Sequence, residues 1–426
     1  MKKIHFIGIF GSGTFRAALA AKRFGFDVTG CDTKFDSPYA RHILDANIPV
    51  ENCHDPIHLD DADIIAVSPA LIEQKISFPE FDAAAASGKM MKWQDFLGEY
   101  ILPKMKTAGI IATHGKTTTS SMLGYIMKKA GLAPTCFIGA NVPQLDNYEP
   151  KTDWAVIEAD EYANNFKSYR PNFMALNNLE MEHPEYFKDF EHYKQTFRDF
   201  FAAQSPDSTL FYNADDINIP DVLTEFKGKK FPYISADLGD IILKLPGAHN
   251  RTNAAAAASV ARTIGISDDI IRDALSQFKG AGHRLEKIYE NDMVAVFDDY
   301  AHHHTQAQTA IRAIRESYPN RKLIAIFEPH QISRYTGNTR ETLTALNGAD
   351  VAIVTEFWRG REPHVPIPDV DKDIEKYGTK NIRYIPNLNE TAVAAVDKLT
   401  APAVILVMGA GQSYKIANKI AELLKQ

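Results

Sequence analysis

The stretch GIIATHGKTTTSS, residues 109–121, contains the residue types that bind phosphate. An apolar run meets Gly115-Lys116-Thr117 and continues into a helix-like segment. In a phosphate-binding loop, backbone N–H groups surround the phosphates, the lysine neutralises the β and γ oxygens, and the hydroxyl binds Mg²⁺. Ile110 occupies the first glycine position of the common G-x-x-x-x-G-K-T pattern, so this would be a variant loop. The alternative is an incidental Gly-Lys pair.

A phosphate loop needs an acidic metal ligand, and the strand-like run WAVIEADE supplies Glu158, Asp160 and Glu161 at its end. Carboxylate oxygens are suitable Mg²⁺ ligands. On its own an acidic strand end is a solvated turn, so this assignment depends on the loop. The later segment NNLEMEH places His183 beyond another strand, where it could ligate a second metal ion. The expected metal ligands are Thr117, Glu158 and His183.

A second glycine turn, GIFGSG, lies at the start of the chain and contains Gly8, Gly11 and Gly13. Glycines between a strand and a helix let the backbone approach a phosphate, and the helix N-terminus attracts its charge. The order is G-x-x-G-x-G, which differs from the dinucleotide pattern G-x-G-x-x-G. Asp32 ends the second strand, where a ribose-binding acid often lies. A nucleotide-type ligand is favoured, and a tight turn with close helix packing is the alternative.

The segment FDDYAHHH gathers Asp298, Asp299 and the three histidines 302–304 just beyond a strand. It lacks the H-x-x-H spacing of a zinc site, and no cysteine accompanies it. We therefore expect contacts with nucleotide and substrate from these residues.

Three more polar residues stand at positions typical of ligand binding. Arg284, in GAGHRLE, lies near an expected domain boundary and could bind a phosphate after domain closure. His330 and Arg334, in EPHQISR, follow another strand end. Ligands of parallel sheets bind at such carboxyl ends. The paired donors of Arg334 would suit a substrate carboxylate, and a surface arginine in a loop is the alternative.

Three blocks of alternating strand-like and helix-like segments must position these residues. Short β-branched runs that alternate with helical patterns predict α/β domains with mainly parallel sheets. The domains are expected at residues 1–105, 106–283 and 284–426. Strands are expected at residues 3–9, 27–32, 61–70, 107–113, 154–160, 173–178, 293–299, 322–328, 350–356 and 403–411, and helices at 14–25, 118–131, 190–204, 250–265, 304–318 and the C-terminus.

The composition is that of an ordinary globular protein. The 426 residues are 45% hydrophobic and 24% charged, and the net charge of −7 argues against a nucleic-acid binder. The three cysteines show no paired spacing, which fits a reducing cytoplasm and predicts neither disulfides nor a metal cluster. No stretch approaches the roughly 20 apolar residues of a membrane span. Three glycines interrupt the apolar N-terminus, which reads as a first strand and not as a signal peptide.

Together these segments resemble the Mur ligase family, the ATP-dependent amide-forming ligases of peptidoglycan synthesis. The resemblance runs through the chain in family order and rests on GIFGSGTFRAALA, ATHGKTTT, EADE, GAHNRTNAAAA, HRLE and DDYAHH. The family loop does not require a glycine at the Ile110 position. The resemblance implies a Rossmann-like N-terminal domain that binds a UDP substrate, a central P-loop ATPase domain, and a Rossmann-like C-terminal domain that binds the amino acid and part of ATP.

Two members of the family share features with this chain. Its start, EPHQISR and VMGAG are most similar to the biosynthetic member that adds L-alanine to UDP-N-acetylmuramate. The segments EADEY and LNNLEMEH are more similar to the recycling member, which adds the tripeptide L-Ala-γ-D-Glu-diaminopimelate. Gln331 replaces an arginine of the usual pattern, and His304 stands where proline is usual. The segment from Tyr212 to Gly247 is shorter than the family implies, as though peripheral strands were missing.

The resemblance implies that ATP phosphorylates the lactyl carboxylate of UDP-N-acetylmuramate and that an amine then attacks the acyl phosphate. L-alanine is the expected amine, and the tripeptide is the alternative. Mg²⁺, or Mn²⁺, would assist as cofactor. The partners are then small molecules only, with no nucleic acid or membrane, and the enzyme would be a cytoplasmic monomer or homodimer.

The implied residue roles are as follows. The catalytic residues are Lys116, His183, His302 as a candidate general base, and Arg334. The nucleotide-binding residues are Ala112, Thr113, His114, Gly115, Lys116, Thr117, Thr118, Asn250, Asn253, Arg284 and Asp299. The substrate-binding residues are Gly8, Gly11, Ser12, Gly13, Asp32, Ser68, His330 and Arg334.

Two functions of other classes remain open from the residues. The N-terminal glycine turn would suit a dinucleotide-dependent oxidoreductase, although hydride transfer does not need a second loop with Lys-Thr. A non-catalytic nucleotide-binding regulator would be expected to lack a metal or phosphate group, yet Lys116, Thr117 and Glu158 are all present.

Overall fold

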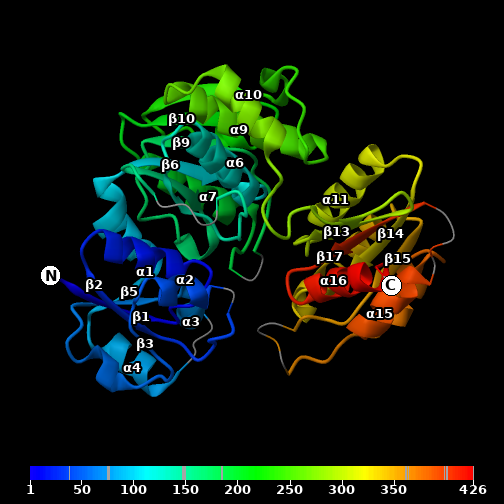
Figure 1. Cartoon of the computed structure of the whole chain (residues 1–426), viewed down its shortest axis with the longest axis horizontal. Helices are drawn as coiled ribbons and strands as arrows, with labels where there is room; N and C mark the ends of the chain where they lie inside the picture. Colours follow the sequence, from blue (N-terminus) through cyan, green and yellow to red (C-terminus); the bar gives the residue numbers. More distant parts are fainter. Residues whose placement is uncertain are drawn as a thin grey trace. The chain divides into compact units, whose positions relative to one another are not determined.

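The structure is a computed structural model that describes residues 1–37, 39–73, 77–145, 150–183, 186–359, 362, 364–397, 399 and 402–425. Figure 1 shows the chain coloured along its sequence. It forms two compact units, one of Met1–Ile241 with Thr252–Ser276 and the other of Ile242–Arg251 with Gln277–Gln426. In the described part, no helix is long and apolar enough to cross a membrane.

The first unit begins with a five-stranded parallel sheet in the order β3-β2-β1-β4-β5. The strands are β1 (Lys3–Ile7), β2 (Asp27–Cys31), β3 (Val50–Glu51), β4 (Ile64–Val67) and β5 (Met90–Lys92). The helices are α1 (Thr14–Arg23), α2 (Ala40–Asp45), the 3₁₀ turn η1 (Pro56–Leu59), α3 (Pro69–Glu73), α4 (Pro79–Ala86), α5 (Trp93–Phe96), the π-helical turn η2 (Leu97–Ile101) and the 3₁₀ turn η3 (Leu102–Lys104). This strand order is typical of a Rossmann-like sheet, the kind of domain that the family resemblance implies for the N-terminal part of the chain.

Alternating side chains of β1 pack on opposite faces of this sheet. Ile4 and Phe6 belong to a core cluster that also contains the alanine face of α1. Ile7 belongs to a smaller apolar cluster on which Phe81 of α4 packs. Both faces are therefore covered, as a parallel sheet requires.

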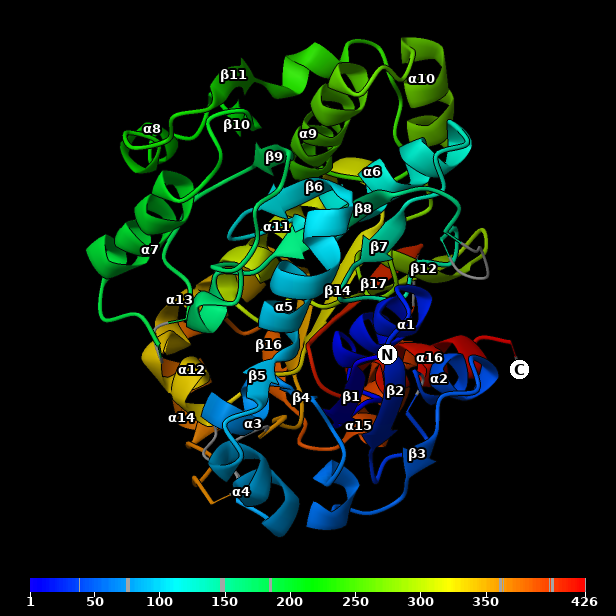
Figure 2. The same cartoon turned by 90° about the vertical axis from the view of Figure 1, so that its left-hand side faces the viewer.

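The second sheet of the first unit has six parallel strands in the order β11-β10-β9-β6-β8-β7. They are β6 (Lys106–Ile111), β7 (Thr135–Phe137), β8 (Trp154–Ala159), β9 (Phe173–Leu176), β10 (Thr209–Asn213) and β11 (Lys229–Tyr233). The associated helices are α6 (Lys116–Lys129), the 3₁₀ turn η4 (Tyr162–Asn164), α7 (Phe190–Ala202), α8 (Ile219–Val222), the 3₁₀ turn η5 (Ser235–Leu238), α9 (Ala248–Thr263) and α10 (Asp268–Gln277). Figure 2 shows α6 lying along β6, β8 and β7.

The second unit contains a six-stranded sheet in the order β12-β13-β17-β14-β15-β16, parallel except for the antiparallel pair β12 and β13. Its strands are β12 (Glu286–Glu290), β13 (Val294–Asp299), β14 (Lys322–Phe327), β15 (Val351–Val354), β16 (Ile382–Tyr384) and β17 (Ala403–Met408). Its helices are α11 (His304–Ser317), α12 (Ile332–Gly337), α13 (Thr339–Leu346), α14 (Val370–Tyr377), α15 (Leu388–Val396) and α16 (Ser413–Leu423).

Buried apolar clusters cover both faces of this sheet, one beneath α11 and α13 and the other beneath α15 and α16. The short segment from Tyr212 to Gly247 still contains one complete strand, β11, which is the last strand of its sheet.

Candidate active site

The loop between β6 and α6 has the geometry of a phosphate-binding turn. β6 ends at Ile111 and α6 begins at Lys116, so four residues make the turn. Gly115 has a φ of 87°, in the left-handed region that favours glycine. A Cβ atom at this position would also collide with the side-chain oxygen of Asn253. Both the backbone angle and the neighbour therefore require glycine, and Asn253 lies beside the loop.

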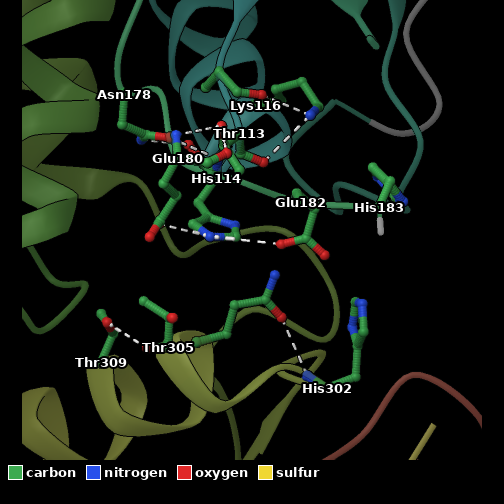
Figure 3. A network of polar contacts seen from close by, with 12 residues as sticks. Thr113, His114, Lys116, Asn178, Glu180, Glu182, His183, His302, Thr305 and Thr309 are labelled. Carbon is green, nitrogen blue, oxygen red and sulfur yellow. Dashed lines mark hydrogen bonds and ion pairs between the residues drawn. The ribbon is translucent and has the colours of Figure 1, made fainter. Parts of the chain in front are cut away.

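Asn178 holds the backbone of this loop. The Thr113 N–H donates to the Asn178 carbonyl oxygen (3.2 Å), and the His114 N–H donates to its side-chain oxygen (2.8 Å). The Asn178 amide group in turn donates to the His114 carbonyl oxygen at 2.8 Å (Figure 3). Three hydrogen bonds to one asparagine fix the turn before any ligand binds.

Lys116 lies within the curve of its own loop. Its Nζ donates to the carbonyl oxygens of Ala112 (2.7 Å) and Thr113 (3.3 Å), and it pairs with Glu161 Oε2 at 2.8 Å. Burial acts to lower the pKa of Lys116, but Glu161 and Asp160 outweigh it, and the net effect raises the pKa. The ammonium group is therefore protonated, and the carboxylate of Glu161 balances its charge.

Glu161 is fully buried and connects two parts of the loop. Its second oxygen, Oε1, accepts from the Tyr193 hydroxyl at 3.0 Å, and that hydroxyl lies 2.9 Å from Thr113 Oγ1. Burial and the neighbouring Glu161 raise the pKa of Tyr193 well above its ordinary value, so the phenol stays protonated. Tyr193 thus joins the loop to the acidic segment.

The expected metal ligands form two groups of donors. In the first, Thr117 Oγ1 donates to Glu158 Oε2 at 3.3 Å, and Glu158 Oε1 accepts from the Gly139 N–H at 3.0 Å. In the second, Asp160, Glu161 and His183 bring donor atoms within 4.8 Å of one another, with His183 Nε2 4.0 Å from Glu161 Oε1. Oxygen donors with a single imidazole fit Mg²⁺ or Mn²⁺. The structure therefore brings Thr117 to Glu158, and His183 to the other two carboxylates.

His114 faces two further acids that the sequence did not single out as ligands. Its Nε2 lies 2.8 Å from Glu180 Oε1 and 3.8 Å from Glu182 Oε2 (Figure 3). These two carboxylates orient the His114 ring beside the loop.

The N-terminal glycine turn follows β1 as expected. Gly8 has a φ of 74°, and its N–H donates to the Cys31 carbonyl oxygen at 2.9 Å. Asp32 is buried, and its carboxylate accepts from the Phe10 N–H (2.9 Å) and the Lys34 N–H (3.0 Å). Gly13 packs on Trp93, because a Cβ atom there would collide with the indole ring. The Asp32 carboxylate therefore shapes the turn by accepting hydrogen bonds from backbone N–H groups.

The remaining residues expected to bind the UDP substrate lie at the same end of this sheet. Gly11 donates its N–H to the Gly8 carbonyl oxygen (3.1 Å), and Ser12 is exposed just before α1. Ser68 follows the carboxyl end of β4 and accepts from the Ala70 N–H at 3.3 Å.

In the second unit, Asp299 ends β13. Its carboxylate accepts from the N–H groups of Leu285 (2.7 Å) and Ala301 (2.8 Å). Burial is the main cause that raises the pKa of Asp299 to about 6. Arg284 lies over the Tyr300 ring, with its guanidinium carbon 4.9 Å from the ring centroid. Asn250 is buried near the start of α9, where its amide donates to the Pro246 carbonyl oxygen at 2.7 Å.

A pocket in the second unit gathers the histidines 302–304, His330 and Arg334. The rings of His302 and His330 lie 5.3 Å apart, and His302 Nδ1 lies 2.9 Å from the Tyr300 carbonyl oxygen. Because that oxygen can only accept, Nδ1 carries a proton and Nε2 has a lone pair. Burial, with Arg334 and His330 nearby, lowers the pKa of His302 well below its ordinary value. The imidazole is therefore neutral, and its Nε2 is a hydrogen-bond acceptor.

The residues that sequence reasoning missed are those that hold others in place. Tyr193 lies in a helix whose pattern indicates only packing, and Asn178 lies within NNLEMEH, a segment in which only His183 has an expected role. A polar residue directly after a central strand was the only signal for Asn178. No sequence signal could have identified Tyr193.

Two family models match separate regions of the chain. Residues 112–240 match the family model of the Mur ligase middle domain. Residues 283–411 match the model described as Mur ligase, glutamate ligase domain.

Among curated proteins, the UDP-N-acetylmuramate–L-alanine ligase of Persephonella marina is 31% identical over 456 residues, covering 100% of this chain and 97% of that protein. The protein with the same name from Caldicellulosiruptor bescii is 32% identical, covering 99% of this chain and 98% of that protein.

Among solved structures, a UDP-N-acetylmuramate-alanine ligase of Thermotoga maritima aligns with a TM-score of 0.78, and a murein peptide ligase of Psychrobacter arcticus with 0.71. Each is 24% identical, and each alignment covers 100% of this chain and 99% of the other. At this identity the likeness establishes a shared three-domain α/β fold.

Proposed function

The chain belongs to the Mur ligase family, and we propose that it joins the lactyl carboxylate of UDP-N-acetylmuramate to L-alanine, with ATP as the energy source, in peptidoglycan precursor biosynthesis. The observation that carries the proposal is the β6–α6 loop, in which Lys116 and Gly115 adopt a phosphate-binding arrangement beside an acidic strand end. The names of the full-length relatives support the choice of amine.

We assign the UDP substrate to residues 1–105, ATP to residues 106–283, and the amino acid with part of ATP to residues 284–426. A UDP-sugar and ATP are cytoplasmic metabolites, so we place the enzyme in the cytoplasm. Its substrates are small molecules, and a monomer or a homodimer would suit this role.

The reaction needs activation because a carboxylate is a poor electrophile. Transfer of the γ-phosphoryl group of ATP to the lactyl carboxylate gives an acyl phosphate and ADP. The amine of L-alanine, as the free base, attacks the acyl carbon, the C–N bond forms, and the bond to phosphate breaks. Inorganic phosphate leaves. The nitrogen that attacked loses its extra proton to a base or to water, which gives the amide. Two anions must meet in the first step, so positive charge at the phosphates governs its rate.

Lys116 and the loop N–H groups would bind the phosphates of ATP, and Asn253 would lie beside them. Thr117 and Glu158 would hold one Mg²⁺ or Mn²⁺ ion, and His183 with Asp160 and Glu161 a second. Bound divalent ions would screen the charge of the phosphates. The chain's own contribution is the pre-formed turn, which Asn178 fixes before ligand arrives.

In the second unit, Asp299 would accept from the ribose hydroxyls of ATP, with Arg284 and Asn250 near the nucleotide. Arg334 and His330 would bind the carboxylate of the amino acid, because both line one pocket. His302 is our candidate for the base that receives the amine proton, since its imidazole is neutral and its Nε2 can accept.

The test is ATP-dependent release of phosphate with UDP-N-acetylmuramate and Mg²⁺. L-Ala, Gly, L-Ser and L-Ala-γ-D-Glu-diaminopimelate are supplied in separate reactions, and product masses are checked. Release with L-Ala and the mass of its amide product support the proposal. Release only with the tripeptide would replace it by a recycling activity, which the segments EADEY and LNNLEMEH favour. No release with any amine would refute ligation of this substrate.

A further inference from the structure

A cluster of four side chains with metal-ligating atoms lies on the far side of the N-terminal sheet from α1, against α4. His5 of β1, Cys31 of β2, His58 of η1 and Glu80 of α4 each offer a donor atom, and these atoms all lie within 4.8 Å of one another. His5, Cys31 and Glu80 are 1%, 0% and 0% exposed. The proposed ligase reaction uses none of these four side chains.

Three of the distances within this cluster are close to the ligand separations of a tetrahedral metal site. Glu80 Oε1 lies 3.3 Å from His5 Nε2 and 3.0 Å from His58 Nδ1, and Glu80 Oε2 lies 3.0 Å from Cys31 Sγ. Ligands around a zinc ion, at 2.0 to 2.3 Å from the metal, are separated from one another by about 3.3 to 3.6 Å. A small outward movement of these side chains would admit the ion.

The surrounding residues orient the ligands as in known metal sites. His5 Nδ1 is hydrogen-bonded to Thr29 Oγ1 at 2.9 Å, which leaves Nε2 directed at the cluster. His54 Nδ1 lies 2.9 Å from Glu80 Oε2 and so positions the carboxylate. His5 Nε2 is buried and makes no hydrogen bond, although Glu80 is near. This nitrogen pairs with Glu80 Oε1 at 3.3 Å, and a metal ion bound by both atoms would replace that contact.

The charge of the cluster also suits a divalent ion. One thiolate and one carboxylate carry two negative charges, and two neutral imidazoles add none, so a divalent cation makes the buried site neutral. A mixed nitrogen, sulfur and oxygen donor set at tetrahedral spacing favours Zn²⁺ over Mg²⁺. Without a metal, Cys31 and the histidines hydrogen-bond or pair with Glu80, and that arrangement is the competing interpretation.

We propose that His5, Cys31, His58 and Glu80 form a structural Zn²⁺ site that fastens η1 and α4 to the N-terminal sheet. Binding releases the proton of the Cys31 thiol, and the thiolate sulfur, two imidazole nitrogens and one carboxylate oxygen complete the coordination. The site is independent of the proposed ligase activity. Cys31 links the site to that activity, because its carbonyl oxygen accepts from the Gly8 N–H of the N-terminal glycine turn.

The experiment uses the full chain, stripped with a chelator, desalted and titrated with Co²⁺ and then Zn²⁺ in saturating Mg²⁺. We expect one equivalent of Co²⁺ to produce the absorption of a tetrahedral ion together with a thiolate-to-cobalt charge-transfer band, which Zn²⁺ abolishes. Zn²⁺ should raise the melting temperature by roughly 5 °C. The Mg²⁺ ligands proposed here include no cysteine, so the thiolate band separates the two sites.

Serine variants of the three cysteines show which thiol binds the metal ion. Cys31→Ser should abolish the thiolate band and weaken Zn²⁺ binding at least roughly 100-fold, whereas Cys136→Ser and Cys53→Ser should retain both. Thr29→Val should keep the band and weaken binding about 10-fold, because it removes only the orienting hydrogen bond. Absence of the band in the unmodified chain would overturn the proposal, even if Cys31→Ser fails to fold. A band that persists in Cys31→Ser would overturn it equally.

Discussion

Lys116 and Glu161 form a buried ion pair in which Nζ lies 2.8 Å from Oε2. The lysine expected to bind phosphate is therefore already paired with an acid of the expected metal segment. Phosphate oxygens must draw Nζ away from Glu161, and a metal ion at Glu161 would compensate for the loss. Nucleotide and metal binding should consequently favour each other at this site.

Lys116→Ala tests the phosphate-binding role directly. We expect kcat to fall at least about 10³-fold, because the charge that screens the phosphates is lost. The Kd for UDP-N-acetylmuramate should change less than about 2-fold, measured by calorimetry. Near-normal turnover in this variant would mean that the loop does not bind ATP.

Tyr193→Phe tests whether the hydroxyl positions Glu161 and Thr113. The variant should lose about 1 kcal/mol of unfolding free energy and about 10-fold in kcat, because one buried carboxylate and one hydroxyl lose a partner. The concentration of Mg²⁺ at half-maximal activity should rise as well, which a purely structural defect would not cause. Tyr212→Phe is the control, since no hydrogen bond of its hydroxyl is present among the described residues.

Gly115→Ala and Gly131→Ala form a matched pair at the two ends of α6. Both glycines have positive φ, 87° and 79°, so each alanine should cost roughly 1 kcal/mol of stability. Only position 115 would also meet Asn253, whereas position 131 faces open space. Gly115→Ala should therefore raise the KM for ATP at least about 10-fold, and Gly131→Ala should leave it unchanged. Equal KM values for ATP in the two variants would show that Gly115 has no role in nucleotide binding.

Arg334→Ala should raise the KM for L-alanine about 100-fold and the KM for ATP less than about 3-fold. The reason is that a carboxylate would lose its paired donors while the nucleotide would not. Arg340→Ala, on the exposed face of α13, is the control. Similar increases in both KM values would contradict a role specific to the amino acid.

Asp299 should make ATP binding pH-dependent. Its pKa is raised to about 6, so the carboxylate that would accept from the ribose becomes protonated as the pH falls through 6. The KM for ATP should rise below that pH, and in Asp299→Asn the profile should be flat in this range. A raised acid pKa favours the folded state most at low pH and loses that contribution as the pH rises through 6. Protonation of Asp299 therefore does not destabilise the fold below pH 6. Melting curves recorded over this pH range should confirm that the rise in the KM for ATP is not caused by unfolding.

The central elements of the fold could be predicted because their signals are local. The apolar run before the Gly-Lys-Thr segment predicted β6, and the pattern after it predicted α6, which begins at Lys116 and not at the expected residue 118. Family membership confirmed the predicted class of enzyme. The strands β3, β5 and β7 have only two or three residues, too few to show an alternating pattern. The antiparallel β12 has the sequence EKIYE, in which charged residues stand at three of the five positions, so no apolar run marks it as a strand.

The candidate site could be predicted as a list of residues but not as a set of contacts. Glu158 lies beside Thr117, as the loop chemistry required. His183 instead lies nearest Glu161, and Lys116 pairs with the same acid. Such pairings depend on how strand ends meet in space. For the same reason, the cysteine spacing predicted no metal cluster, although the fold brings Cys31 to two histidines and Glu80, which are distant in the sequence.

The position of β11 at the end of its sheet bears on how the protein behaves at high concentration. An exposed strand edge is a template for pairing with another chain, and such pairing leads to aggregates. Here the edge strand has the sequence KKFPY, with Lys229 and Lys230 exposed and Pro232 lacking an N–H to donate. Charge repulsion between copies and a missing donor both oppose growth of the sheet. Both features of β11 therefore protect this end of the sheet against fibre formation.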